Sequence, residues 1–137
     1  MVGRLPGHFH FQDGCMAVDF YRRIRVRLFW GLTAFAYVAA IMPGEDAPDF
    51  RAGDKTNHII AFLVLTLVGR TAYRRKPAWL LASGLSLFGI VIELTQAIPV
   101  FQRDASVWDW LADSSAILVA LGIAILTEKR FPRPFAT

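Results

Sequence analysis

Cysteine is almost absent from this chain of 137 residues, in which Cys15 is the only one. A single thiol allows no internal disulfide, no cysteine-based zinc knuckle and no CxxC redox pair. The first residues also lack the basic start and apolar run of a signal peptide, and the chain holds no repeat and no low-complexity tract. These absences exclude a disulfide-stabilised scaffold and leave redox chemistry without support.

Apolar residues, by contrast, are abundant, at 55% of the chain. A soluble domain of this size leaves much of its surface in water, so this composition is better matched to lipid. The net charge of +4 comes from Lys and Arg residues that flank apolar segments and are not interleaved with exposed aromatics. That arrangement favours anionic lipid head groups over nucleic acid as partners. The composition therefore predicts an all-α polytopic membrane protein with membrane lipids, and no nucleic acid, around it.

Apolar runs separated by polar loops predict four transmembrane helices in a domain of residues 22–130. The predicted helices cover about residues 26–42, 56–73, 78–98 and 107–127. The third is long enough to cross a hydrocarbon core of about 30 Å at about 1.5 Å per residue. The second has a short apolar centre that is ambiguous by itself.

The segments outside this domain are predicted to be tails. Residues 1–21 have no sustained periodicity, which indicates an irregular tail or an amphipathic surface segment. Met16 is a second candidate start site, and its use would leave residues 1–15 untranslated. Residues 131–137 form a short C-terminal tail.

The uneven distribution of Lys and Arg predicts the orientation. Twelve of the fifteen lie before or at the start of the first predicted helix, near the end of the second or before the third, or after the fourth; the others are Arg51, Lys55 and Arg103. Because loops rich in these residues stay in the cytoplasm, both termini are predicted to be cytoplasmic. Only four spans place all twelve on one side of the membrane, so the weak second helix is also predicted to cross it. At the helix ends, Trp79, Trp108 and Trp110 are predicted to lie in interfacial belts.

Polar residues within the predicted helices fall toward the outer leaflet. Three pairs, each three or four residues apart, share a helix face: Asp54 with His58, Glu93 with Gln96, and Asp109 with Asp113. An ionisable group in lipid costs roughly 2.5 to 3.5 kcal/mol on insertion scales, so these carboxylates should face the bundle or a water-filled cavity. Lys55, His58 and Arg103 are the available cations. The sequence therefore predicts a charged pocket open to the outer leaflet.

Three spaced blocks resemble the VanZ-like family of bacterial membrane proteins. The blocks are Asp54-Lys55-x-x-His58-x-x-x-Phe62, Gly89-x-x-x-Glu93-x-x-Gln96 and Arg103-x-x-Ser106-x-x-Asp109-x-x-x-Asp113. Their order within about residues 50 to 125 is more specific than any single block. The family pattern usually has Asn in place of Asp113 and Gly in place of Ala116. The resemblance implies a multi-pass protein of the bacterial inner membrane and, for the founding member, reduced susceptibility to teicoplanin-type glycopeptides.

The leading functional interpretation is recognition of a polar head group at the envelope face, on an envelope lipid or a lipid-linked cell-wall precursor. The predicted ligand-binding residues are Asp54, Lys55, His58, Glu93, Gln96, Arg103, Ser106, Asp109 and Asp113. Lys55 and Arg103 suit a phosphate or carboxylate, which Arg can bind through two parallel hydrogen bonds. The sequence leaves the ligand and the oligomeric state open.

Other interpretations of the same residues stay open. Glu93 or His58 could act as a general base on a lipid substrate, with Arg103 stabilising the developing charge, although no nucleophile motif accompanies them. In a structural or assembly subunit, Glu93 and Gln96 would instead make interhelical hydrogen bonds, while Asp54 and Ser106 cap helices. A metal site is disfavoured because the ligand spacing matches no known motif, so no metal or cofactor is predicted.

Overall fold

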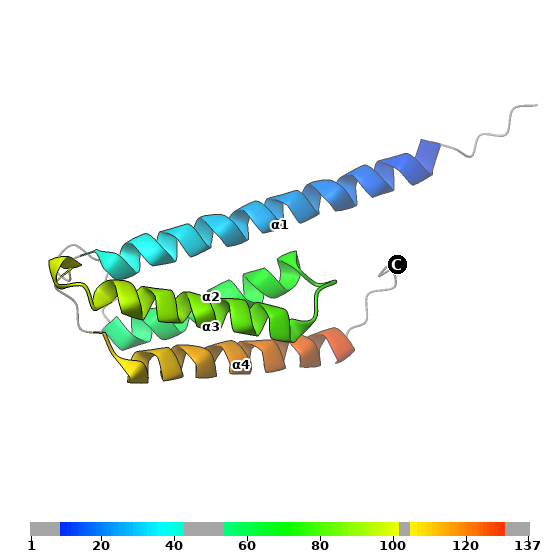
Figure 1. Cartoon of the computed structure of the whole chain (residues 1–137). Coiled ribbons are helices and arrows are strands. Elements are labelled where there is room, and N and C mark those ends of the chain that lie inside the picture. The colour runs from blue at the N-terminus through cyan, green and yellow to red at the C-terminus, as the bar shows by residue number, and fades with distance from the viewer. Residues whose placement is uncertain (1–8, 43–53, 102–104, 131–137) are drawn as a thin grey trace, which may run out of the picture.

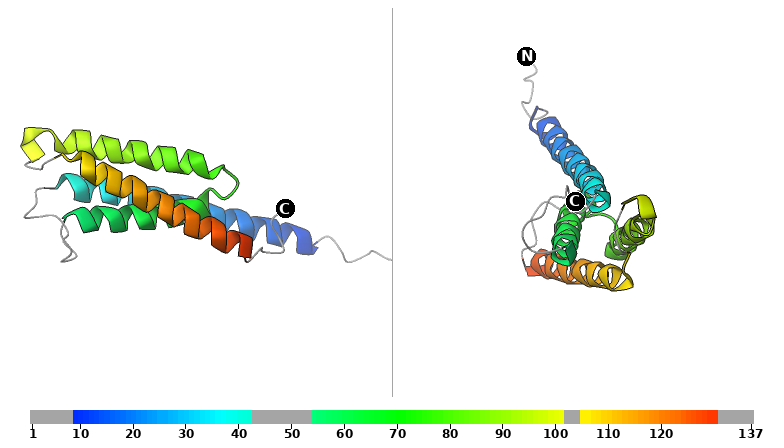
Figure 2. Two further views of the ribbon diagram at one scale, coloured as in Figure 1. Left: turned by 90° about the horizontal axis from the view of Figure 1, so that it is seen from below. Right: turned by 90° about the vertical axis from the view of Figure 1, so that its left-hand side faces the viewer.

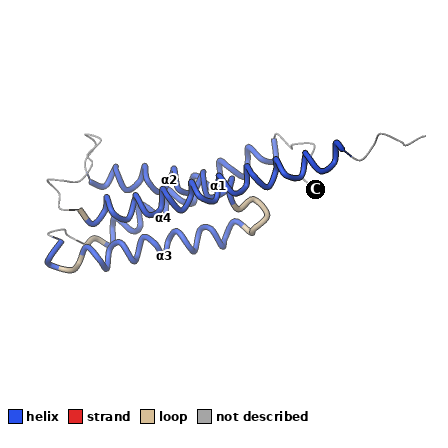
Figure 3. The backbone as a smooth tube through the Cα atoms, turned by 90° about the horizontal axis from the view of Figure 1, so that it is seen from above, coloured by secondary structure: helices blue, strands red, loops and turns tan. Residues whose placement is uncertain are grey.

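The computed structural model describes residues 9–42, 54–101 and 105–130, with side chains from residue 19 in the first segment and from residue 56 in the second. This part of the chain is helical and contains no strand (Figure 3). Its elements are α1 (Phe9–Ile41), α2 (Asp54–Ala72), α3 (Ala78–Gln96), the short 3-10 helix η1 (Pro99–Phe101) and α4 (Val107–Arg130). The predicted all-α class is confirmed.

The helices run alternately up and down along one another (Figure 1). One end of the bundle, the acidic end, holds the ends of α1 and α3 and the starts of α2 and α4. The opposite, basic end holds the connection between α2 and α3 and the end of α4. Figure 2 shows the same bundle from two further sides, and α2 packs mainly against α4 and α1, while α3 packs mainly against α4.

Three of the described helical segments are long and apolar enough to cross a membrane: Asp19–Ile41 within α1, α3 and α4. The apolar stretch of α2, Thr56–Ala72, is shorter. Large apolar side chains line the outside of the bundle, and Leu118 and Leu126 of α4 are 66% and 67% exposed. Because exposed apolar surface of this kind is unfavourable in water, helix length and surface together indicate a membrane protein.

The first helix is much longer than the sequence predicted. α1 begins at Phe9, so the prediction of an irregular tail over residues 1–21 is wrong for residues 9–21, and Met16 lies within the helix. No proline occurs between Pro6 and Pro43, and only proline removes both the backbone donor and the steric room that a helix needs. The helix therefore begins at Phe9, well before the apolar run that begins at Leu28. Residues 1–8 and 131–137 lie outside the described residues.

The core lies around α2. Phe62, Leu65 and Thr66 are almost completely buried, and the Thr66 hydroxyl is satisfied within its own helix by donating to the Phe62 carbonyl at 2.6 Å. Small residues allow the neighbouring helices to approach closely. Ala116 of α4, where the VanZ-like pattern has Gly, is buried in this core.

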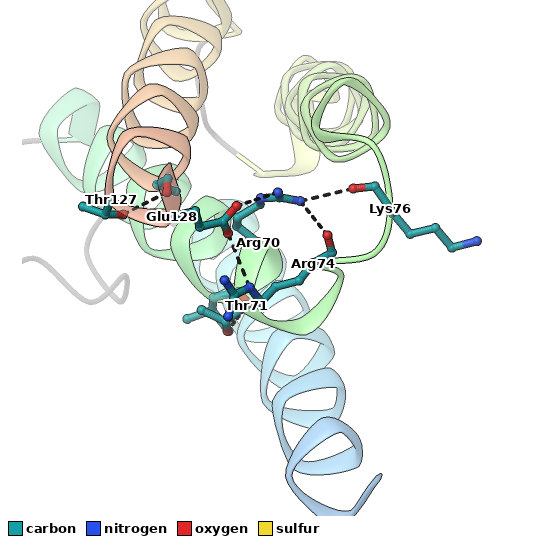
Figure 4. A network of polar contacts seen from close by, with 8 residues as sticks. Arg70, Thr71, Arg74, Lys76, Thr127 and Glu128 are labelled. Atoms are coloured by element: carbon teal, nitrogen blue, oxygen red, sulfur yellow. Dashed lines mark hydrogen bonds and ion pairs between the residues drawn. The ribbon is translucent and has the colours of Figure 1, made fainter. Parts of the chain in front are cut away.

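Arg70 connects three parts of the basic end (Figure 4). Its Nη2 donates to Oε2 of Glu128 at 2.7 Å, which links α2 to α4. Its Nη1 donates to the backbone carbonyls of Arg74 and Lys76 at 3.2 and 3.1 Å, which fixes the turn between α2 and α3. Hydrogen bonds from a charged guanidinium are stronger than neutral ones. In the sequence, the one signal for this contact is that Glu128 is the only acidic residue after Asp113 and lies among basic residues at the same end of the bundle as Arg70.

Candidate functional site

Four of the predicted site residues come together at the acidic end, from three helices. His58 lies in the second turn of α2, Glu93 in the last turn of α3, and Asp109 and Asp113 in the first two turns of α4. Asp109, His58 and Asp113 all lie within electrostatic range of the Glu93 carboxylate. Antiparallel packing brings these residues together because each lies near the same end of its helix.

His58 and Asp113 form a buried contact between α2 and α4. Nδ1 of His58 lies 3.5 Å from Oδ2 of Asp113, and the two side chains are only 10% and 3% exposed. The other carboxylate oxygen of Asp113, Oδ1, is also buried and accepts no hydrogen bond from the described residues. A buried acceptor without a donor costs free energy, so this oxygen gains from any donor that reaches it.

Glu93 joins the end of α3 to the start of α4. Its Oε2 accepts a 2.6 Å hydrogen bond from the backbone N–H of Ser106, the residue immediately before α4. This contact supports the interhelical role that the structural interpretation gives to Glu93. Its Oε1, in contrast, is buried and accepts no hydrogen bond from the part of the chain that the structure describes. The carboxylate is thus held by one oxygen and can accept a further hydrogen bond with the other.

Gln96 lies one turn beyond Glu93 and packs toward α1. Its Nε2 donates to the Ala40 carbonyl at 2.8 Å in a buried position near the end of α1, where helical carbonyls lack an intrahelical donor. Tyr37 makes a second link, because its hydroxyl lies 3.2 Å from Oγ1 of Thr95. Gln96 therefore holds α3 against α1, as expected of a polar side chain in a membrane bundle. Sequence reasoning missed Tyr37, whose polar tip within the apolar run 28–42 was the available signal.

The predicted cations Lys55 and Arg103 lie at the edge of the described residues or outside them. Asp54 and Lys55 form the first residues of α2 at the acidic end, and their side chains lie outside the described part. Arg103 lies wholly outside the described residues. Among the residues that are described, no group of three His, Cys, Asp or Glu is arranged to hold a metal ion.

Trp110 differs from the predicted interfacial belt. Trp79 and Trp108 are 69% and 75% exposed, which fits side chains at a membrane surface. The Trp110 indole instead donates to the carbonyl and the hydroxyl oxygen of Ser86 at 3.3 and 3.1 Å. It therefore packs the first turn of α4 against α3, because an indole N–H that is withdrawn from the surface needs an acceptor.

Two carboxylate oxygens of the cluster, Glu93 Oε1 and Asp113 Oδ1, are buried and accept no hydrogen bond from the described residues. Neither protein-family models, nor curated proteins, nor solved structures gave a match to this chain. The geometry of the acidic end is thus the direct evidence about function. Carboxylate oxygens held by neighbouring helices suit a ligand that presents hydrogen-bond donors or positive charge.

Proposed function

We propose that the chain is a VanZ-like inner-membrane protein whose acidic end recognises the polar head group of an envelope lipid or a lipid-linked cell-wall precursor. The observation that carries this proposal is the pair of buried oxygens, Glu93 Oε1 and Asp113 Oδ1, that accept no hydrogen bond from the described residues. Burial makes such oxygens unfavourable in an unliganded bundle. Donors on a head group, such as hydroxyl, amide or ammonium groups, would satisfy both.

The proposed ligand has two chemical parts. The described residues supply acceptors, and the remaining predicted residues, Lys55 and Arg103, supply positive charge for a phosphate. Lipid head groups and lipid-linked precursors combine a phosphate with hydroxyl, amide or ammonium donors. Such a ligand would therefore match both the acceptor residues and the two cations. A role in glycopeptide susceptibility belongs to the same proposal and follows only from the family resemblance.

The proposed topology has four spans, with both termini in the cytoplasm. Its support is the alternating direction of the helices and the position of Arg74, Arg75, Lys76, Lys129 and Arg130 at the basic end. α2 crosses the membrane in this arrangement although its apolar stretch is short, because α1 and α4 cover it.

Single-cysteine labelling tests the topology. In a Cys15→Ala background, Ala105→Cys should react in intact cells with a membrane-impermeant maleimide, whereas Lys129→Cys should react only after lysis. Both positions are exposed, so access depends on the side of the membrane. The reverse pattern would mean that α4 runs in the opposite direction and that the proposed orientation is wrong.

Native mass spectrometry in mild detergent tests the function. Wild-type protein should retain a defined lipid or lipid-linked precursor, and Glu93→Gln and Arg103→Ala should lose most of it. Asp19→Asn is the matched control, because it makes the same carboxylate-to-amide exchange at an exposed position on α1. All variants are first shown to have equal thermal stability.

The outcomes separate the functional classes. Loss of the bound molecule from the two site variants alone identifies a recognition site and its ligand. If Glu93→Gln keeps the molecule but abolishes its conversion to a product, the site is catalytic. If no defined molecule accompanies any form of the protein, head-group recognition is wrong and the acidic end has a structural role.

A further inference from the structure

A second site lies between α1 and α3, away from the acidic cluster. A cavity of about 490 Å³ opens there, with Phe29 and Trp30 of α1 on one side and Leu81, Gly84 and Phe88 of α3 on the other. α1 packs more closely on α2 than on α3, which leaves room at this contact. The cavity therefore lies on the lipid-facing side of the bundle and reaches inward between two helices.

The lining of this cavity is apolar in effect. The Trp30 indole donates to the Tyr73 hydroxyl at 2.9 Å, and the Thr33 hydroxyl donates to the Phe29 carbonyl at 2.8 Å. Both hydrogen bonds are made within the protein, so a ligand meets mainly aromatic rings and aliphatic side chains. Such a surface suits a hydrocarbon chain and offers little to a polar molecule.

The depth of the cavity matches one leaflet. Its α3 lining runs from Leu80 to Val91, which is about 16 Å at the rise of an α-helix. Half of a hydrocarbon core of about 30 Å is about 15 Å. Val91 lies 13 residues, or about 20 Å, beyond the start of α3, so the cavity extends from the basic end to somewhat past the middle of the helix.

Lys76 lies at the outer limit of the cavity, at the basic end. Its backbone is fixed, because its N–H donates to the Tyr73 carbonyl at 2.9 Å and its own carbonyl accepts from Arg70. Its side chain extends away from the Arg70 and Glu128 pair (Figure 4) and forms no ion pair with the described residues. A fixed backbone and an unengaged ammonium at the membrane surface suit a lipid phosphate.

We propose that this cavity holds one acyl chain of an anionic phospholipid from the leaflet at the basic end, with its phosphate beside Lys76. The apolar lining, the one-leaflet depth and the positive charge at the mouth all select this occupant. The site is independent of head-group recognition at the acidic end, since its mouth at Lys76 lies at the opposite end of the bundle and it shares no residue with the acidic cluster.

Two variants test the proposal with purified, delipidated protein in detergent. Gly84→Leu should fill the cavity without strain, because a Cβ at Gly84 meets no atom within 4 Å. Gly122→Leu is the matched control, since a Cβ at Gly122 also meets nothing within 4 Å and this residue does not line the cavity. Lys76→Ala removes the charge at the mouth, and Arg75→Ala removes the neighbouring charge as its control.

The measurement is native mass spectrometry during titration with phosphatidylglycerol or phosphatidylcholine of identical acyl chains. Wild type should bind one phosphatidylglycerol in preference, and Lys76→Ala should reduce that preference about fivefold, as expected for one cation at a membrane surface. Gly84→Leu should lose the first bound lipid of either kind, whereas both controls should behave as wild type. Unchanged binding by Gly84→Leu would overturn the proposal. A dimer that Gly84→Leu dissociates would also overturn it, because a second copy would then cover this face.

Discussion

Gly69→Leu is expected to destabilise the bundle more than any other substitution proposed for this protein. A Cβ at position 69 would lie 2.8 Å from Cε2 of Phe29 and 2.9 Å from Cδ1 of Leu81, well inside the optimal carbon separation of about 3.5 to 4.0 Å. Three helices, α1, α2 and α3, meet at this glycine. Phe29 has little room to move, because its ring also makes edge contacts with Trp30 and Tyr73. Overpacking a core by extra methylene groups costs about 1 to 3 kcal/mol of folding free energy. Leucine adds four carbon atoms at this position, so we expect a loss in the upper part of that range.

Unfolding in a denaturing detergent, followed by circular dichroism, measures this effect. Gly31→Leu is the control, because a Cβ at Gly31 meets no atom within 4 Å and leucine favours the helix over glycine by up to about 1 kcal/mol. Relative to wild type, Gly69→Leu should therefore be less stable, whereas Gly31→Leu should be equally stable or more stable. Equal stability of the two proteins would mean that α1 and α3 do not converge on Gly69.

Asp113→Ala is expected to have the second-largest effect, at about 2 kcal/mol. The carboxylate is 2% exposed, and its removal takes the partner at 3.5 Å away from the buried His58 imidazole. Asp113→Asn introduces the residue usual in the VanZ-like pattern that the sequence resembles, and it keeps an oxygen acceptor and nearly the same volume. It should cost much less than the alanine variant.

A double-mutant cycle separates pairing from simple loss of volume. The free energies of unfolding of His58→Ala, Asp113→Ala and the double variant should give a coupling energy of about 1 kcal/mol, in the range found for residues in contact. Strictly additive losses would show that the two side chains do not stabilise each other. Asp113→Asn is the better variant for ligand measurements, because it is expected to keep the fold intact.

The sequence predicted those features that depend on one helix at a time. Apolar run length placed α3 and α4 within a few residues of their observed limits, and the position of Glu93 near one helix end predicted the end of the bundle at which it lies. The start of α1 could not be predicted in this way. The apolar pattern reports where lipid begins, whereas the helix continues until its backbone is interrupted.

Features that depend on helix rotation and contact were beyond sequence reasoning. The pairing of His58 with Asp113, and of Glu93 with the Ser106 backbone, requires the relative rotation of two helices, which periodicity alone does not determine. The close approach at Gly69 depends on three helices at once. In the sequence, the positive charge of Arg70 near a membrane surface indicates only orientation, because Lys and Arg have that role by default. Its contact with Glu128 became visible only when α2 and α4 were placed side by side.

The length of α1 also determines how far the start of this helix extends beyond the membrane surface. At about 1.5 Å per residue its 33 residues measure about 50 Å, against a hydrocarbon core of about 30 Å. A crossing of about 30 Å takes about 20 residues counted back from Ile41, so the first part of α1, from Phe9 to about residue 21, carries the helix about 20 Å further at the basic end. Head groups add only about 5 to 8 Å on each side of the core. A tag or reporter joined ahead of Phe9 would therefore start in the aqueous phase, clear of the lipid surface.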